Sequence, residues 1–260
     1  MKKLHFLYQM RLDLSQMVQD HHFLIRCIPM EDDNQKIEQF ACQITPADTI
    51  DQVQDGFGNL GYAGAVRAPH DHLQIQAEGT VQVSGVFRRE SLHPMYRFQS
   101  AYTVPGDGIR RFLKETEEEL GRLPGDRSGL QFMMNRLSGR FVYVPGVTGV
   151  KTRAEEALTG GEGVCQDYAH IFISLCRLAG VPARYVAGMM TGEGQTHAWA
   201  EVWMDGGWYG FDPTNNRMVD ETYIKLTHGR DFADGAVDKG CFLGFASQTQ
   251  QIFVKVEETA

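Results

Sequence analysis

The chain has 260 residues, a formal net charge of −8, and 42% apolar against 22% charged residues. These values are typical of a globular protein with one or two domains. The acidic balance argues against nucleic acid or an anionic membrane as the main partner, because both require a basic surface. No run approaches the ~20 apolar residues that a membrane-spanning helix needs.

The N-terminus and the cysteines bear on location. Met1-Lys2-Lys3 resembles the start of a signal peptide, but Arg11 and Asp13 interrupt the apolar stretch and no small-residue cleavage site follows. The scattered cysteines contain no CxxC pair, so they indicate neither a disulfide framework nor a cysteine-rich zinc site: Cys27, Cys42, Cys165, Cys176 and Cys241. The simplest expectation is a reduced, cytoplasmic protein.

Residues 1–105 show short apolar stretches separated by turn signals, a spacing that predicts a β-sandwich. The predicted strands are 4–14, 23–28, 37–44, 61–66, 73–77 and 81–86, with the turn cluster DGFGN at 55–59 between two of them. The segment 91–105 is predicted to be a linker. We therefore expect one domain over residues 1–105 and a second over residues 106–260.

Helical periodicity follows residue 105, with apolar stripes over 109–120 and 130–137. Thr152 and Glu155 match a capping box that would open a short helix ending at Gly160-Gly161. A longer helix is predicted from about Cys165 to Ala179. Strands are then predicted at 183–189, 196–204, 208–211, 223–226 and 252–256, and the C-terminal ones are expected to complete the second domain.

Cys165 is the first candidate for chemistry. Glycines precede it in GEGVC (161–165), and it occupies the first turn of the predicted helix. The orphan N–H groups and the positive end of the helix dipole favour a thiolate at this position, as a cysteine nucleophile requires. A small buried hydrophobic residue is equally compatible with the position alone, and that is our interpretation of Cys176.

A predicted hairpin supplies partners for this cysteine. If Asp205-Gly206 is a two-residue turn, the numbers of paired residues sum to 411 and His197 lies opposite Thr214. Asp212 is then the diagonal neighbour of His197 on the same face, ~7–8 Å away at Cα and within side-chain reach. Taken alone, His197 could be an exposed strand histidine, and Asp212 could be the first residue of an Asp-Pro turn. A one-residue bulge would also separate the pair.

Three blocks of the chain resemble the core motifs of bacterial transglutaminase-like proteins: GEGVCQDYAHIFISLCRLAGVPARYVAG (161–188), HAWAEVW (197–203) and GWYGFDPT (207–214). The likeness extends to 141–158 and 228–244, and the N-terminal stretch resembles the β-rich domain that often precedes this core. The resemblance implies an α+β protein: an N-terminal β-sandwich followed by a papain-like core, with the cysteine-bearing helix packed on an antiparallel sheet. It also implies a Cys165, His197 and Asp212 triad.

Two further residues are assigned to the site. The resemblance places an aromatic donor upstream of the short helix, and Tyr143 is the residue that could donate to an oxyanion beside the Cys165 N–H. Its alternative is a core strand tyrosine. Trp199 could form a substrate wall, although aromatic strand residues more often belong to the core. His21, His22, His70 and His72 lack a carboxylate pattern and are expected at the surface, so no metal and no cofactor is predicted.

The predicted function is thiol-dependent hydrolysis of amide bonds in peptides or proteins through a thioester. Amine transfer onto glutamine remains open, because the same acyl-enzyme serves both reactions. So does a non-catalytic binding module that keeps the fold. Water is the expected acceptor: only 31 residues separate Cys165 from His197, with no long insertion that could position a lysine. No calcium loop is found in the sequence.

Overall fold

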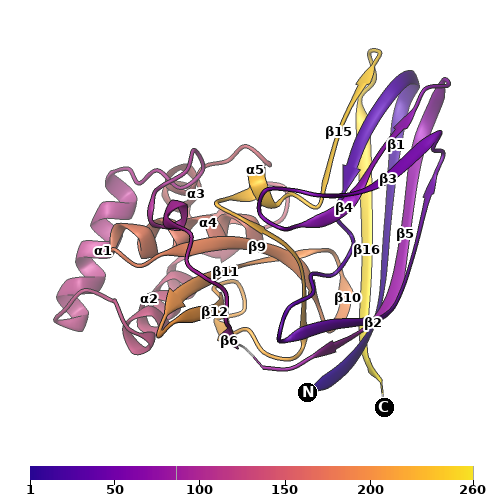
Figure 1. Ribbon diagram of the computed structural model, residues 1–260. Coiled ribbons are helices and arrows are strands. Elements are labelled where there is room, and N and C mark those ends of the chain that lie inside the picture. Colours follow the sequence, from indigo (N-terminus) through magenta and orange to yellow (C-terminus); the bar gives the residue numbers. More distant parts are fainter. Residues whose placement is uncertain (86, 260) are drawn as a thin grey trace.

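The computed structural model describes residues 1–85 and 87–259 and shows two large β-sheets with a helical layer (Figure 1). The upright strands β1, β5 and β16 form a large sheet on one side. The helices α1 to α4 gather on the far side of a second sheet, which contains β9, β11 and β12. The protein is therefore a mixed, α+β structure, as the sequence predicts.

The large sheet is organised around β1 (Lys2–Ile25), which is far longer than the two short strands predicted there. Its first half alternates strictly, with Leu4, Phe6, Tyr8 and Met10 buried on one face. This half pairs with β16 (Gln248–Thr259) and β5 (His70–Val83), and the second half pairs with β15 (Asp238–Leu243) and β4 (Leu60–Val66). The strand-rich N-terminal region is confirmed, and its strands form one connected sheet through β1.

The edges of this sheet come from short or exposed strands. Strand β2 (Gln35–Thr45) pairs with β5, and β3 (Thr49–Gln54) pairs with β4. At the opposite edge, β10 (Gly192–Gly194) pairs with β16. Of the C-terminal strands expected to complete the second domain, the one at 223–226 joins the second sheet, whereas β15 and β16 hydrogen-bond to β1. The apolar even-numbered positions of β16, such as Val254 and Val256, extend the buried face of β1, which explains this pairing.

The second sheet runs in the order β13-β12-β11-β9-β14, and β6 also pairs with β12. Its strands are β6 (Phe87–Arg88), β9 (Ala183–Met190), β11 (His197–Met204), β12 (Gly207–Asp212), β13 (Arg217–Met218) and β14 (Tyr223–Gly229). The predicted linker is a packed connection. It contains a 3₁₀ turn, η1 (Pro94–Arg97), in which Tyr96 is buried, and Ser100 and Thr103 are buried behind it.

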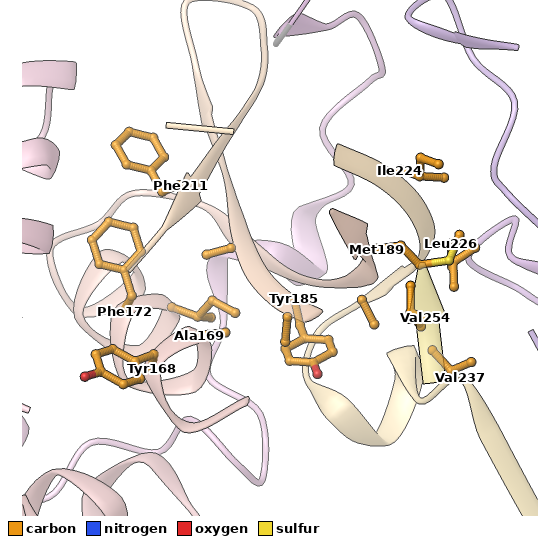
Figure 2. Packing of buried hydrophobic residues seen from close by; sticks show 14 of the residues in the cluster. Tyr168, Ala169, Phe172, Tyr185, Met189, Phe211, Ile224, Leu226, Val237 and Val254 are labelled. Carbon is orange, nitrogen blue, oxygen red and sulfur yellow. The ribbon is translucent and has the colours of Figure 1, made fainter. Parts of the chain in front are cut away.

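Helix α4 (Cys165–Leu178) lies against β9 and β11 and is buried on almost every side. Figure 2 shows Tyr168, Ala169 and Phe172 of this helix beside Phe211 of β12. The ring centroids of Phe172 and Phe211 are 5.5 Å apart. Because the helix is packed so closely on the hairpin that carries His197, the first turn of α4 has a fixed position relative to that hairpin.

The remaining helices are α1 (Asp107–Leu120), α2 (Arg127–Arg140), α3 (Ala154–Gly160) and the short α5 (Phe232–Gly235). The predicted capping box is wrong in detail. The Glu155 carboxylate accepts hydrogen bonds from the N–H groups of Gly106, Gly108 and Ile109, so it caps α1. The Glu156 carboxylate instead accepts a hydrogen bond from the N–H of Arg153, the N-cap residue of α3. A sequence pattern cannot distinguish a local cap from one made to a neighbouring helix.

Candidate active site

Cys165 is the first residue of α4, as predicted, and Val164 before it is extended, with φ −117°. The loop is held by Asp167, whose carboxylate accepts hydrogen bonds from the Val164 N–H at 2.8 Å and the Thr148 hydroxyl at 2.6 Å. Asp167 is almost fully buried, and this burial raises its pKa. Gly163 is required here because a Cβ would lie 2.5 Å from the Asp167 carboxylate. The thiol therefore sits over the N–H end of a helix.

His197 is the first residue of β11, and the predicted hairpin register is confirmed. Met204 pairs with Gly207 and Ala200 with Phe211, so the residue numbers of each pair sum to 411. Asp205 and Gly206 both have left-handed φ values, 51° and 81°, as a type I′ turn requires. The register brings His197 Nε2 to 2.7 Å from Asp212 Oδ2.

Asp212 is completely buried and has hydrogen-bond donors at both oxygens. Oδ2 accepts from His197, from Asn215 Nδ2 at 2.7 Å and from the Tyr223 hydroxyl at 2.8 Å. Oδ1 accepts from the backbone N–H groups of Thr214 and Asn215. Burial alone would raise the pKa of Asp212, but these hydrogen bonds and the His197 charge outweigh it and lower the pKa. The carboxylate is therefore kept ionised beside the imidazole.

Asn215 and Tyr223 were not predicted as site residues. Asn215 follows Asp212 by three residues in the turn DPTN, and this spacing was the signal that could have identified it. Tyr223 begins β14 and reaches Asp212 across the sheet, so no local pattern indicates its role.

The imidazole of His197 bridges the carboxylate and the thiol. Burial opposes its positive charge, but hydrogen bonds to Asp212 and Cys165 more than compensate and raise the pKa of His197 to about 10. Since Nε2 faces Asp212, Nδ1 is the nitrogen left for the thiol. Asp212 and His197 are thus hydrogen-bonded, and Cys165 lies close enough to His197 to help raise its pKa. Such an arrangement can move a proton from the thiol to the imidazole and hold the resulting ion pair.

Trp199 does not fit the predicted substrate wall. It is 1% exposed, and its ring lies 6.2 Å from the His197 ring at an interplanar angle of 28°. Tyr223 packs edge-on against it at 5.4 Å, and Val186 completes this buried cluster. Trp199 lies two positions after His197 along β11, so its side chain shares the face of His197 and packs behind the imidazole.

An open cleft of about 740 Å³ reaches Cys165 and His197. Tyr143, at the end of β7 (Val142–Tyr143), lines this cleft and is half exposed. It pairs with Gly163 of β8 (Glu162–Gly163), and partial burial together with the nearby Cys165 raises its pKa. The predicted donor therefore lies beside the nucleophile, on the cleft surface. The opposite wall comes from β10 and β16, whose contribution the sequence did not indicate.

The histidines of the N-terminal region are only partly as predicted. His21 and His70, expected at the surface, are buried and stacked, with ring centroids 5.3 Å apart and 3.1 Å between Nδ1 and Nε2. They pack at the bend of β1, where Phe242 covers His21. Within residues 1–85 and 87–259, no group of three His, Cys, Asp or Glu side chains is arranged to hold a metal ion. Nor does any helix of these residues have the length and apolarity to cross a bilayer.

Comparisons with known proteins match both parts of the chain. Residues 115–213, which include Cys165, His197 and Asp212, match the model of the transglutaminase-like superfamily. Residues 4–82 match that of the bacterial transglutaminase-like N-terminal region. The chain belongs to the bacterial transglutaminase-like proteins.

Relatives and solved structures agree with this assignment. An uncharacterised protein of Mycobacterium leprae is 29% identical over 257 residues, covering 90% of this chain and 91% of its own. One from Mycobacterium bovis is 33% identical over 215 residues, covering 70% and 68%. A crystal structure from Cytophaga hutchinsonii, provisionally described as a cysteine protease, superposes with a TM-score of 0.81 at 23% identity. It covers 100% of this chain and 91% of that one, and shows that the two-part fold is shared.

Proposed function

We propose that this protein hydrolyses amide bonds in peptides or proteins through a Cys165 thioester. The observation that carries the proposal is the hydrogen-bonded Asp212–His197 pair, which shares an open cleft with Cys165 at a helix N-terminus. A buried imidazole with a raised pKa, in contact with a thiol at a helix N-terminus, is arranged to generate a thiolate. The family assignment supports the same chemistry.

Each residue has one role in the proposed reaction. The Cys165 thiolate attacks the amide carbonyl, and the His197 imidazolium protonates the departing amine. Water then attacks the thioester with His197 as the base, which releases the acid and restores the thiol. Asp212 stays ionised and stabilises the imidazolium throughout. The Cys165 N–H and the Tyr143 hydroxyl are the proposed donors to the oxyanion.

Water is the proposed acceptor because the cleft is open around Cys165, and an amine acceptor would need a site that excludes water. The test incubates the enzyme with glutamine- and amide-containing peptides and a millimolar primary amine, and follows the products by mass spectrometry. Hydrolysed products should dominate, and Cys165→Ala should form none. If amine adducts dominate across the pH range, the protein is a transferase. If wild type and Cys165→Ala both leave every peptide intact, the catalytic proposal fails.

A further inference from the structure

The cleft beside Cys165 contains an imbalance of charge. Within the described residues it is lined by two carboxylates, Glu193 and Asp238, and by no lysine or arginine. Glu193 is exposed on β10 and has a cation nearby, because Lys255 Nζ lies 3.6 Å from its carboxylate. Asp238 differs: among the described residues no cation lies within ion-pair distance of it. The uncharged Gln250 lines the same cavities as Asp238 and lowers its pKa.

Asp238 is held in place by the large sheet. It is the first residue of β15 and pairs with Ile25 of β1. The preceding backbone is fixed by Arg26, whose N–H donates to the Val237 carbonyl at 2.6 Å and whose Nη1 donates to the Ala236 carbonyl at 2.7 Å. The carboxylate is therefore presented to the cleft by a rigid element.

The surroundings of Asp238 are mostly apolar. Val237, Ile252 and Val254 line the same cleft, and burial raises the pKa of Asp238. Asp238 and Gln250 also line an adjoining small pocket of about 80 Å³, whose other walls include Phe23. An ionised carboxylate in apolar surroundings costs free energy when no cation is paired with it. A ligand that carries a positive charge would supply that partner.

We infer that Asp238 selects substrates that carry an alkylammonium or guanidinium side chain near the amide attacked by Cys165. The aliphatic stem of such a side chain fits the walls formed by Val237 and Ile252, and its charged head binds Asp238 and the Gln250 amide oxygen. A carboxylate on the wall of a substrate pocket can set a preference for basic residues in this way. The inference rests on the proposed function, since it names the substrate class of the same cleft.

The test compares matched peptides in which each position in turn holds lysine, its uncharged isostere norleucine, or glutamate. At one position, wild type should show a kcat/KM for lysine about 10- to 100-fold above that for norleucine, because a buried charged hydrogen bond is gained. Asp238→Asn should reduce this ratio to within about threefold while hydrolysis of the norleucine peptide persists. That persistence, with a native thermal unfolding profile, shows that the variant is folded.

Glu193→Gln is the matched control, because it removes a carboxylate of the same cleft that already has Lys255 nearby, and it should keep the lysine preference. Asp238→Glu should keep part of it. Equal rates for lysine and norleucine in wild type, or an undiminished preference in Asp238→Asn, would overturn the inference.

Failure of the proposed function has a different signature, namely no hydrolysis of any peptide. Labelled lysine and norleucine peptides are then titrated against full-length Cys165→Ser protein and followed by fluorescence anisotropy. Tighter lysine binding that Asp238→Asn abolishes would support the cation site without turnover. Equal binding of both peptides would overturn it.

Discussion

Two buried carboxylates lie on neighbouring strands of the second sheet, and their surroundings differ in one respect. Asp212 on β12 faces His197, whose charge can be gained and lost. Glu201 on β11 contacts a lysine and an arginine instead: Lys225 Nζ lies at 2.7 Å and Arg184 Nε at 2.6 Å. Burial would raise the pKa of Glu201, but the Lys225 and Arg184 charges lower it strongly.

The block HAWAEVW therefore contains both a candidate catalytic residue, His197, and a member of a structural ion network, Glu201. The Glu201 carboxylate contacts Arg184 of β9 and Lys225 of β14 and does not line the cleft, so this buried network holds β9, β11 and β14 together. In the Asp212–His197 pair, the imidazole can gain and lose a proton, and it lies next to the open cleft. Substitutions in the two sites should therefore have different consequences, one for turnover and the other for folding.

The largest effect is expected for Asp212→Asn. The variant should fold but lose turnover by roughly 10²–10⁴, because the imidazole loses the group that orients it and stabilises its cation. Steady-state hydrolysis together with circular dichroism checks both parts. Activity within a few-fold of wild type would show that another carboxylate orients His197.

Glu201→Gln should show the opposite pattern. The substitution removes the carboxylate that Lys225 contacts and leaves Arg184 with Glu90 as its carboxylate partner, and we expect about 3–5 kcal/mol less free energy of unfolding. Urea denaturation measures this change, with the exposed Glu257→Gln as control. Turnover per folded molecule should change little. A loss of turnover without destabilisation would mean that the network positions His197.

The pH dependence sharpens the comparison further. The pKa of His197 is raised to about 10, above its unfolded value near 6.5. Its contribution to stability is therefore fully present below about pH 6.5 and is lost as the pH rises towards 10. The alkaline limb of kcat/KM should lie near this raised pKa and move to lower pH in Asp212→Asn. An unmoved limb would contradict the assigned Asp212–His197 coupling.

Tyr223→Phe should have the smallest effect. It removes one of several donors to Asp212, and a single hydrogen bond contributes about 1 kcal/mol, so turnover should fall several-fold. Kinetics at saturating substrate would detect this. A loss as large as that of Asp212→Asn would assign Tyr223 a direct part in the reaction.

The sequence predicted the catalytic geometry better than the arrangement of sheets. Periodicity and a two-residue turn determine register, so the His197–Asp212 contact followed from local information. The pairing of β15 and β16 with β1 depends on contacts more than 200 residues apart, which no local pattern encodes. The burial of Trp199 and the reach of Tyr223 to Asp212 likewise depend on packing between strands. Glu155 shows the same limit, because its cap is made to another helix.

The most direct test of the triad is the reactivity of the five cysteines in the native protein. A limiting amount of iodoacetamide is added, and the adducts are mapped by mass spectrometry. Cys241 is exposed and Cys165 is partly buried, so accessibility alone favours Cys241. A thiolate paired with His197 should reverse that order, and we expect Cys165 to be labelled first in wild type and much more slowly in His197→Ala. Preferential labelling of Cys27, Cys42, Cys176 or Cys241 in wild type would contradict the assignment of Cys165 as the nucleophile.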